Sequence, residues 1–397
     1  MNILYIGINN SYFNPSCLLT PKALDLFANV TRYGPGFSSR DLLSKGLDEF
    51  SSKNSSDFDF IFIHSNLIID LDYSDYINWL SSYTYLFPNH GLTESFFDDV
   101  KRFCSKHKHK VICSVMDLDI YLTQQPRLDA IDKSCNFIMT WGSDIFNTLT
   151  DADLFHKENY LNRKLKLNNK LEVGLFDNFV DENSHRVINL GHFVADHEFF
   201  YGDVKLRPFD IVTPGTPYYR REKFNTAIKN TKHINNYNDY IFLKYVIKVL
   251  SVLKLKPFAK KSILSLYNSS FSSSLFRSKA AYTDGGITNF PIRKFFEIPA
   301  AGCALICSPF LGIEKLGFNH MESYISLSRD DNPIDVLDYL LSNPDLFSKI
   351  ATNGQIITRR NHSLYSRANQ LESALQQILL GKFKGSTWRS GNFELLK

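Results

Sequence analysis

The chain has 397 residues, of which 44% are hydrophobic and 22% are charged, and its formal net charge at pH 7 is +4. This length exceeds one ordinary hydrophobic core and predicts two domains, while the small net charge argues against a nucleic-acid-binding protein. No stretch approaches the roughly 18 consecutive apolar residues of a membrane-spanning helix, and we expect no signal peptide before the first predicted strand.

The six cysteines are scattered through the sequence, and most of them lie inside apolar segments. No two have the C-x-x-C spacing of a zinc site, and the basic run at residues 106–110 is typical of a helix end. We therefore expect reduced thiols, no bound metal and a cytoplasmic protein.

Short apolar runs alternate with helical segments through the first half of the chain. Residues 2–8, 58–64, 110–116 and 136–140 predict buried strands, and residues 93–106 predict a helix. This alternation is typical of a parallel, doubly wound sheet, whose functional groups collect where the strands end. The side chains at those ends are Asn9, Ser65, Asp117, Asp119 and Trp141.

A polar stretch at residues 151–186 predicts a loop before the chain crosses to a second unit. That unit begins with a predicted strand at residues 209–212, followed by Gly215 and then by Arg220 and Arg221 at a helix start. A glycine loop that leads into a helix N-terminus is a typical anion site, because unpaired N–H groups point outward. Arg221 is the first candidate for binding phosphate and Arg220 the second. The alternative is a solvated arginine pair on an exposed turn.

Residues 241–280 alternate apolar side chains with lysines and then become serine-rich. The commoner explanation is a helix with a solvated basic face, and the alternative is a surface that meets anionic lipid headgroups. The lysines concerned are Lys244, Lys248, Lys254, Lys256, Lys260 and Lys261.

Residues 283–308, with the sequence TDGGITNFPIRKFFEIPAAGCALICS, predict a loop, a short helix and a buried strand. Gly285 and Gly286 allow the backbone to approach a ligand, because neither carries a Cβ. Thr288 or Asn289 can cap the helix, and Pro291 suits its first turn. This arrangement predicts a second anion site, and the alternative is an ordinary loop and helix of an α/β domain.

The same helix places Glu297 two turns from its start and ends at Gly302, before an apolar strand at residues 303–307. Further on, Asn332-Pro333 and Asn343-Pro344 each predict a helix start. Apolar residues at helical spacing from residue 364 to 379 predict one long terminal helix.

The stretch from Arg293 to Gly302, RKFFEIPAAG, resembles the signature of group 1 glycosyltransferases of the GT-B type, and is most similar to their spore-maturation (CgeB-like) branch. The similarity continues to residues 362–368, HSLYSRA, and is looser in the first half of the chain. It implies an α/β fold of the GT-B class, with two Rossmann-like, doubly wound domains that face each other across a cleft. The implied parts are an acceptor domain at 1–190, a donor domain at 191–375, and a helix end with a tail at 376–397.

The resemblance also assigns residues to a nucleotide-sugar donor. Glu297 matches the glutamate that binds the nucleotide ribose, and Asn289 stands where the wider class has a second glutamate near the donor sugar. Arg293 lies on the same side of the helix as Glu297 and can either pair with it or contact the ligand. The implied donor site also includes Gly215, Arg220, Arg221, Gly285 and Gly286.

Asp117 and Asp119 resemble the metal-binding D-x-D of the other glycosyltransferase fold. Because the C-terminal half follows the GT-B pattern, which needs no metal, the better prediction is a role in acceptor binding or general-base catalysis. Capping of the strand end is the alternative.

The resemblance therefore implies a retaining, metal-independent glycosyltransferase that moves a sugar from a nucleotide-sugar donor to a glycan, lipid-linked or protein acceptor. We expect no cofactor and no nucleic-acid partner, and we consider peripheral contact with an anionic membrane at its inner face. Two alternatives stay open. One is a nucleotide-sugar epimerase on the same fold, and the other is a catalytically silent Rossmann-type binding protein, suggested by Asn289.

Overall fold

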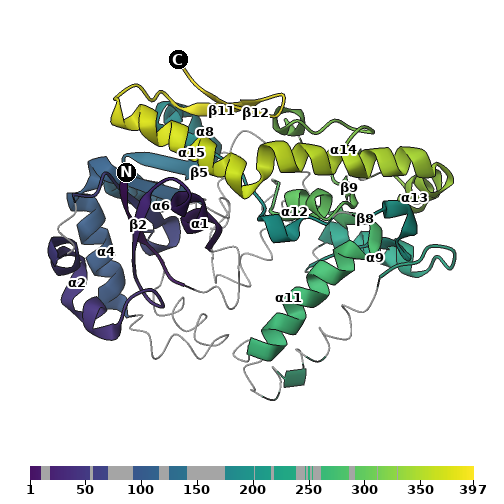
Figure 1. Ribbon diagram of the computed structural model, residues 1–397, viewed down its shortest axis with the longest axis horizontal. Helices are drawn as coiled ribbons and strands as arrows, with labels where there is room; N and C mark the ends of the chain where they lie inside the picture. Colours follow the sequence, from purple (N-terminus) through teal and green to yellow (C-terminus); the bar gives the residue numbers. More distant parts are fainter. Residues whose placement is uncertain are drawn as a thin grey trace.

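The computed structural model contains two parallel β-sheets, one in each half of the chain, with helices packed on both faces of each (Figure 1). The structure describes residues 1–9, 18–53, 57–69, 93–115, 125–140, 175–200, 202–215, 219–237, 246, 249–250, 253, 261–285, 291–310, 312–328 and 330–397. None of the helices in these ranges is long and apolar enough to cross a bilayer.

The first sheet has six strands in the order β2-β1-β3-β4-β5-β6, and every neighbouring pair is parallel. The strands that the apolar runs predict are confirmed, but β2 was not predicted. It is an edge strand with the polar sequence NVTRY and only one buried residue, so it lacks an apolar run. The strands are β1 Asn2–Ile6, β2 Asn29–Tyr33, β3 Phe60–His64, β4 Val111–Val115, β5 Phe137–Thr140 and β6 Val187–Asn189.

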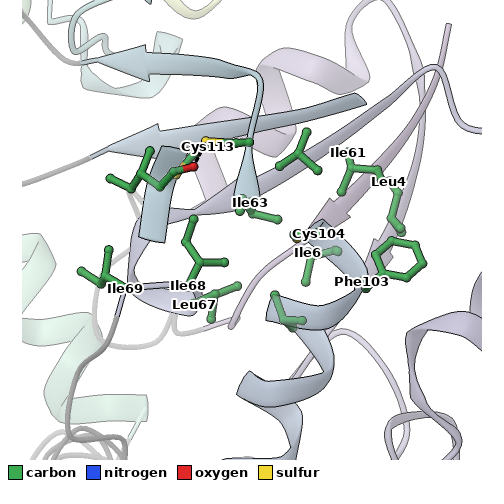
Figure 2. Packing of buried hydrophobic residues seen from close by; sticks show 14 of the residues in the cluster. Leu4, Ile6, Ile61, Ile63, Leu67, Ile68, Ile69, Phe103, Cys104 and Cys113 are labelled. Atoms are coloured by element: carbon green, nitrogen blue, oxygen red, sulfur yellow. Dashed lines mark hydrogen bonds between the residues drawn. The ribbon is translucent and has the colours of Figure 1, made fainter. Parts of the chain in front are cut away.

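Helices from both ends of the chain cover this sheet. One face packs against α2, α4, α6 and α8, and the other packs against α1 and the terminal helix α15. Figure 2 shows the first of these cores, where isoleucines of β1 and β3 meet Phe103 and Cys104 of α4. The helices are α1 Leu19–Asp25, α2 Arg40–Lys53, α4 Glu94–Lys106, α6 Gln125–Ser134, α8 Leu175–Glu182 and α15 Leu364–Leu379.

The prediction of a loop at residues 151–186 is wrong at its C-terminal end, where α8 forms. Val180 of this helix is buried in the first core, and Phe179 packs against that core. The packing of these two residues stabilises the helix, and the polar residues around them made its apolar pattern hard to recognise. Most of the remainder of that stretch lies outside the described residues.

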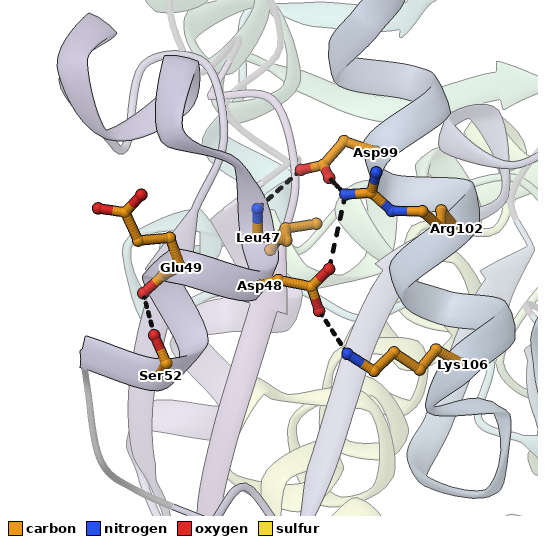
Figure 3. Close-up of polar contacts among 7 residues, drawn as sticks. All are labelled: Leu47, Asp48, Glu49, Ser52, Asp99, Arg102 and Lys106. Atoms are coloured by element: carbon orange, nitrogen blue, oxygen red, sulfur yellow. Dashed lines mark hydrogen bonds and ion pairs between the residues drawn. The ribbon is translucent and has the colours of Figure 1, made fainter.

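A carboxylate on α4 caps the second part of α2 (Figure 3). Gly46 interrupts α2 with a φ of 81°, a conformation that favours glycine, and the helix resumes at Leu47. Asp99 of α4 accepts a hydrogen bond from the Leu47 N–H at 2.7 Å and pairs with Arg102 at 2.5 Å. The restarted helix thus takes its N-terminal acceptor from a neighbouring helix instead of from its own sequence.

The second sheet has four parallel strands in the order β10-β9-β8-β7. β7 and β9 confirm the predicted strands, whereas β8, SKAAYT, was not predicted because its central alanines give only a weak apolar signal. One face packs against α9, α13 and the first turns of α14, and the other packs against α11 and α12. The strands are β7 Phe209–Val212, β8 Ser278–Thr283, β9 Ala304–Cys307 and β10 Ile325–Ser326. The helices are α9 Tyr219–Lys229, α11 Lys261–Phe276, α12 Lys294–Ala300, α13 Pro333–Ser342 and α14 Pro344–His362.

The basic stretch at residues 241–280 is only partly described. Its longest described element is α11, whose exposed side chains include Ser262, Ser265, Leu266 and Ser269. The lysines from 244 to 260 lie outside the described residues, so contact with anionic lipid stays a prediction.

The chain passes from one sheet to the other twice, first between β6 and β7 and again between α14 and α15, and the two passages are hydrogen-bonded to each other. Val194, in the first passage, forms a parallel β-bridge with Ser363, which lies between α14 and α15. The Val194 N–H donates to His362 O at 3.1 Å, and Val194 O accepts from the Leu364 N–H at 2.8 Å. From there α15 runs back over the first sheet, nearly in line with α14 (Figure 1). The predicted long terminal helix is therefore confirmed.

The segment predicted as a tail forms a hairpin, β11 Ser386–Arg389 with β12 Asn392–Leu395. Ser386 Oγ accepts from the Asn189 N–H at 2.8 Å, which attaches the hairpin to β6 of the first sheet. At its turn, the Gly391 N–H donates to Lys315 O at 2.8 Å in the second domain. The hairpin therefore bridges the two domains, which a short polar sequence does not predict.

A fully buried arginine lies where the two passages meet the hairpin. Arg367 donates to His362 Nδ1 at 2.6 Å and to backbone oxygens of His192 and Asn361 at 2.9 Å and 2.8 Å. Its guanidinium carbon lies 4.5 Å from the ring centre of Trp388, on β11. Trp388 in turn donates its indole N–H to Asn189 O at 2.8 Å.

We predict that Trp388→Ala lowers the free energy of unfolding by about 3–5 kcal/mol, because a buried ring and its indole hydrogen bond are lost together. Urea unfolding followed by fluorescence or circular dichroism measures this change. Tyr365→Ala is the matched control, since that aromatic side chain is 56% exposed, and we expect a change within about 0.5 kcal/mol. Equal stability of the two variants would contradict the role given to Trp388.

Candidate functional site

The candidate site lies where β7 and β8 end, beside the first turn of α12. In a parallel α/β sheet, the loops at the carboxyl ends of the strands form the ligand crevice. Gly215 follows β7, Asp284 and Gly285 follow β8, and Lys294 begins α12. The fold thus brings the loop after β7, the loop after β8 and the start of α12 together at one edge of the second sheet.

Gly215 has a φ of +96°, and its conformation leaves room for two cationic side chains. A Cβ at this position would stand 2.7 Å from Lys294 Cε, 3.2 Å from Lys294 Nζ and 3.2 Å from Arg221 Nη1. The two nitrogen atoms therefore approach the same point beside the loop. Two like charges so close repel each other, and an anion bound there would be attracted to both.

Arg221 is buried, so the alternative of a solvated pair on an exposed turn is wrong for this residue. Its side chain is 1% exposed, and its Nη2 donates to Asp284 Oδ1 at 2.7 Å and to Thr283 Oγ1 at 3.2 Å. The Asp284 carboxylate balances much of the arginine charge. Arg221 is therefore a structural partner of β8 as well as a candidate phosphate ligand.

Arg220 points to a different space from Gly215 and Lys294. It lines a cavity of about 90 Å³ together with Lys223 and Phe224 of α9, Tyr282 at the end of β8, and Asp331 before α13. Neither Gly215, Lys294 nor Glu297 lines this cavity. The two neighbouring arginines of the sequence thus face different surroundings.

Lys294 was missed by the sequence analysis. It lies three residues before Glu297, which places both on one side of a helix, and this spacing is the signal that could have found it. Burial lowers the pKa of the Lys294 amine, the Glu297 carboxylate opposes that shift, and the charges of Arg221 and Arg293 add to it. Lys294 is the one cationic residue within α12, and its Nζ would lie 3.2 Å from a Cβ at Gly215.

Glu297 forms the predicted ion pair with Arg293, with Nη1 and Oε1 3.1 Å apart. The same arginine also pairs through Nη2 with Glu198, from the passage between the domains. Glu198 lies in a 3-10 turn, Asp196–Glu198, and its involvement had no sequence signal. Arg293 thus joins the first passage to the helix that carries Glu297.

The predicted start of this helix needs correction. α12 begins at Lys294 without a side-chain cap, so Pro291 precedes the helix and Glu297 lies in its first turn. The predicted end is confirmed, since Gly302 has a φ of +68° and β9 follows from Ala304. A later start brings Glu297 closer to the carboxyl edge of the sheet than the sequence predicts.

Four predicted site residues lie outside the described part of the chain: Asp117, Asp119, Gly286 and Asn289. Their roles stay predictions. Within the described ranges, no group of three or more His, Cys, Asp or Glu side chains is arranged to hold a metal ion.

The arrangement of the two sheets defines a GT-B fold, with two Rossmann-like domains that are joined by two adjacent passages of the chain. Residues 248–373 match the family model described as "Glycosyl transferase-like". No curated protein matches the chain. The matched segment includes α12 with Lys294 and Glu297, and the assignment to the CgeB-like branch stays a prediction.

Several solved structures resemble the chain over nearly its whole length. Sucrose-phosphate synthase from Thermosynechococcus elongatus has a TM-score of 0.49 and 11% identity, covering 96% of this chain and 100% of that chain. A glycosyltransferase from Rickettsia africae has a TM-score of 0.47 and 12% identity, with coverages of 95% and 98%. Anabaena Alr3699/HepE in complex with UDP and glucose has a TM-score of 0.46 and 11% identity, with coverages of 95% and 100%.

We predict that Arg221→Ala destabilises the protein by about 3–5 kcal/mol, because it leaves the buried Asp284 carboxylate without its cation. Thermal or urea unfolding measures the loss. The double variant Arg221→Met with Asp284→Asn removes both charges, and we expect it to recover much of the stability. A fully stable Arg221→Ala protein would show that this buried pair contributes little.

Proposed function

We propose that this protein is a glycosyltransferase that takes a sugar from a nucleotide-sugar donor and transfers it to a glycan, lipid-linked or protein acceptor. The observation that supports this best is the approach of Lys294 and Arg221 to Gly215, one helical turn from Glu297. Lys294 and Arg221 would bind the diphosphate, and Glu297 would accept hydrogen bonds from the ribose hydroxyls. The match of residues 248–373 to a glycosyl transferase-like family adds to this proposal.

The proposed chemistry follows from how charge develops during transfer. As the bond from the sugar to the diphosphate breaks, negative charge grows on the leaving oxygen, and a cation in a water-poor site stabilises that state more than the ground state. Lys294 fits this role because Asp284 already balances much of the charge of Arg221. In a retaining transfer, the acceptor hydroxyl attacks from the face that the diphosphate leaves, so no enzymic nucleophile is needed.

Several parts of the proposal rest on the resemblance of the sequence alone. The first domain, residues 1–190, would bind the acceptor, with Asp117 or Asp119 as general base. The second, residues 191–375, would bind the donor, with Gly285, Gly286 and Asn289 near the sugar. Cations rather than a metal ion would neutralise the diphosphate, so we propose a metal-independent reaction.

A turnover assay tests the function. Thermal shifts with UDP, GDP and ADP identify the nucleotide, because a ligand that binds only the folded state raises the melting temperature. The matching nucleotide sugar, added with an acceptor, should then release free nucleoside diphosphate, and the rate should survive EDTA. Isomerised donor without released diphosphate would favour an epimerase, and binding without either product would favour a silent binding protein. Loss of activity in EDTA with rescue by Mg²⁺ would restore the D-x-D hypothesis for Asp117 and Asp119.

We predict that Lys294→Gln weakens the binding of the identified nucleoside diphosphate by about 10- to 100-fold, the usual range for one hydrogen bond to a charged group. The affinity for the nucleoside without phosphates should stay unchanged. Isothermal titration calorimetry measures both. Lys223→Gln, which removes an exposed lysine of α9 at the neighbouring cavity, is the matched control. Unaltered diphosphate affinity in Lys294→Gln would rule out this amine as a phosphate ligand.

A further inference from the structure

We propose that Glu198 is a positioning residue for the nucleoside subsite. It lies on the passage between the domains and holds Arg293, and Arg293 in turn holds the carboxylate of Glu297. This inference rests on the proposed function, in which Glu297 binds the ribose hydroxyls.

The geometry fixes both oxygen atoms of Glu198. Its Oε2 accepts the N–H of Ala195 at 2.6 Å, within the same short turn, and its Oε1 pairs with Arg293 Nη2. The side chain is 15% exposed, so little water competes for either contact. A carboxylate held by its own backbone is a rigid anchor for an arginine that must keep one orientation.

Arg293 uses opposite ends of its guanidinium for the two carboxylates. Nη2 contacts Glu198 and Nη1 contacts Glu297 Oε1 at 3.1 Å, and the arginine side chain is 20% exposed. Glu297 Oε2 takes part in no hydrogen bond among the described residues. The arginine therefore orients one oxygen of Glu297 and leaves the other for a ligand.

Two carboxylates around one arginine also balance charge in a way that favours binding. Burial raises the pKa of Glu198, the Arg293 charge opposes that shift, and the Glu297 charge adds to it. If Glu198 were neutral, Glu297 would be the one charged carboxylate paired with Arg293 in the described part of the chain, and the pair would close more tightly. A tighter pair would draw the Glu297 carboxylate toward Arg293 and away from the ribose hydroxyls. Each hydroxyl would then have to compete with the full arginine charge for that carboxylate.

The passage does not depend on Glu198 for its position. Phe200 donates its N–H to Ala300 O at 3.1 Å, and Gln355 Nε2 donates to Phe200 O at 2.7 Å. Val194 is paired on its other side with the segment around Ser363. Replacing Glu198 by glutamine therefore changes one charge in a segment that other contacts hold, and the variant should fold.

A double-mutant cycle tests the inference, with Glu198→Gln, Glu297→Gln and the double variant in the full-length chain. Calorimetry measures affinity for whichever of UDP, GDP and ADP binds the wild-type protein, and for its 2′,3′-dideoxy analogue. We expect Glu198→Gln to weaken binding of the ribose form by roughly tenfold and to leave the affinity for the dideoxy analogue unchanged. The double variant should bind no more weakly than Glu297→Gln alone, because residues that act through one another are not additive.

Asp203→Asn serves as the control. This exposed residue lies on the same passage, and its carboxylate accepts only the N–H of Lys205 in the described part of the chain, so affinity should stay at the wild-type value. Unchanged affinity in Glu198→Gln, or losses that multiply in the double variant, would overturn the inference. Equal weakening of both nucleotides by Glu198→Gln would also overturn it, because it would indicate a general fault in the site. If the wild-type protein binds no nucleoside diphosphate, the proposed function fails, and the inference about Glu198 fails with it.

Discussion

The buried guanidinium of Arg367 is the constraint on which the arrangement of the two domains depends. A cation removed from water needs partners for its N–H groups, and here those are oxygen and nitrogen acceptors together with the face of Trp388. No carboxylate takes part in its hydrogen bonds among the described residues, and burial lowers the arginine pKa. Such a group is stable only if all its partners are present at once, so the segments that supply them must come together.

These partners come from both passages and from the C-terminal hairpin. His362 accepts from Arg367 at Nδ1 and contacts Leu316 O through Nε2 at 2.8 Å. Burial and the charge of Arg367 lower the pKa of His362, which favours a neutral ring with its proton on Nε2. Trp388 reaches Asn189 at the end of the first sheet. One polar cluster thus links β6, the end of α14, the start of α15 and the hairpin.

The first passage connects this cluster to the candidate site, because it contacts Arg367 at His192 and Arg293 at Glu198. His192 gives its backbone oxygen to Arg367, and burial together with the charges of Arg293, Arg367 and Lys294 lowers its side-chain pKa to about 3. Six residues later, Glu198 contacts Arg293. The segment that joins the domains therefore contacts a charged residue of the proposed donor site. A shift of one domain against the other would then change how Glu198 holds Arg293 and Glu297.

The sequence by itself determined the alternation of strands and helices, the long terminal helix and the pairing of Arg293 with Glu297. These follow from local rules, because apolar runs must be buried and residues four apart on a helix are neighbours. Tertiary structure decided which cations face the glycine loop. Arg221 is drawn to Asp284, 63 positions along the chain, while Lys294 reaches Gly215 across the sheet edge. It also decided the contact of Glu198 with Arg293 and the bridging hairpin. The packing of the strands and helices determines which charged residues from distant parts of the chain come into contact. A local sequence pattern cannot predict such contacts.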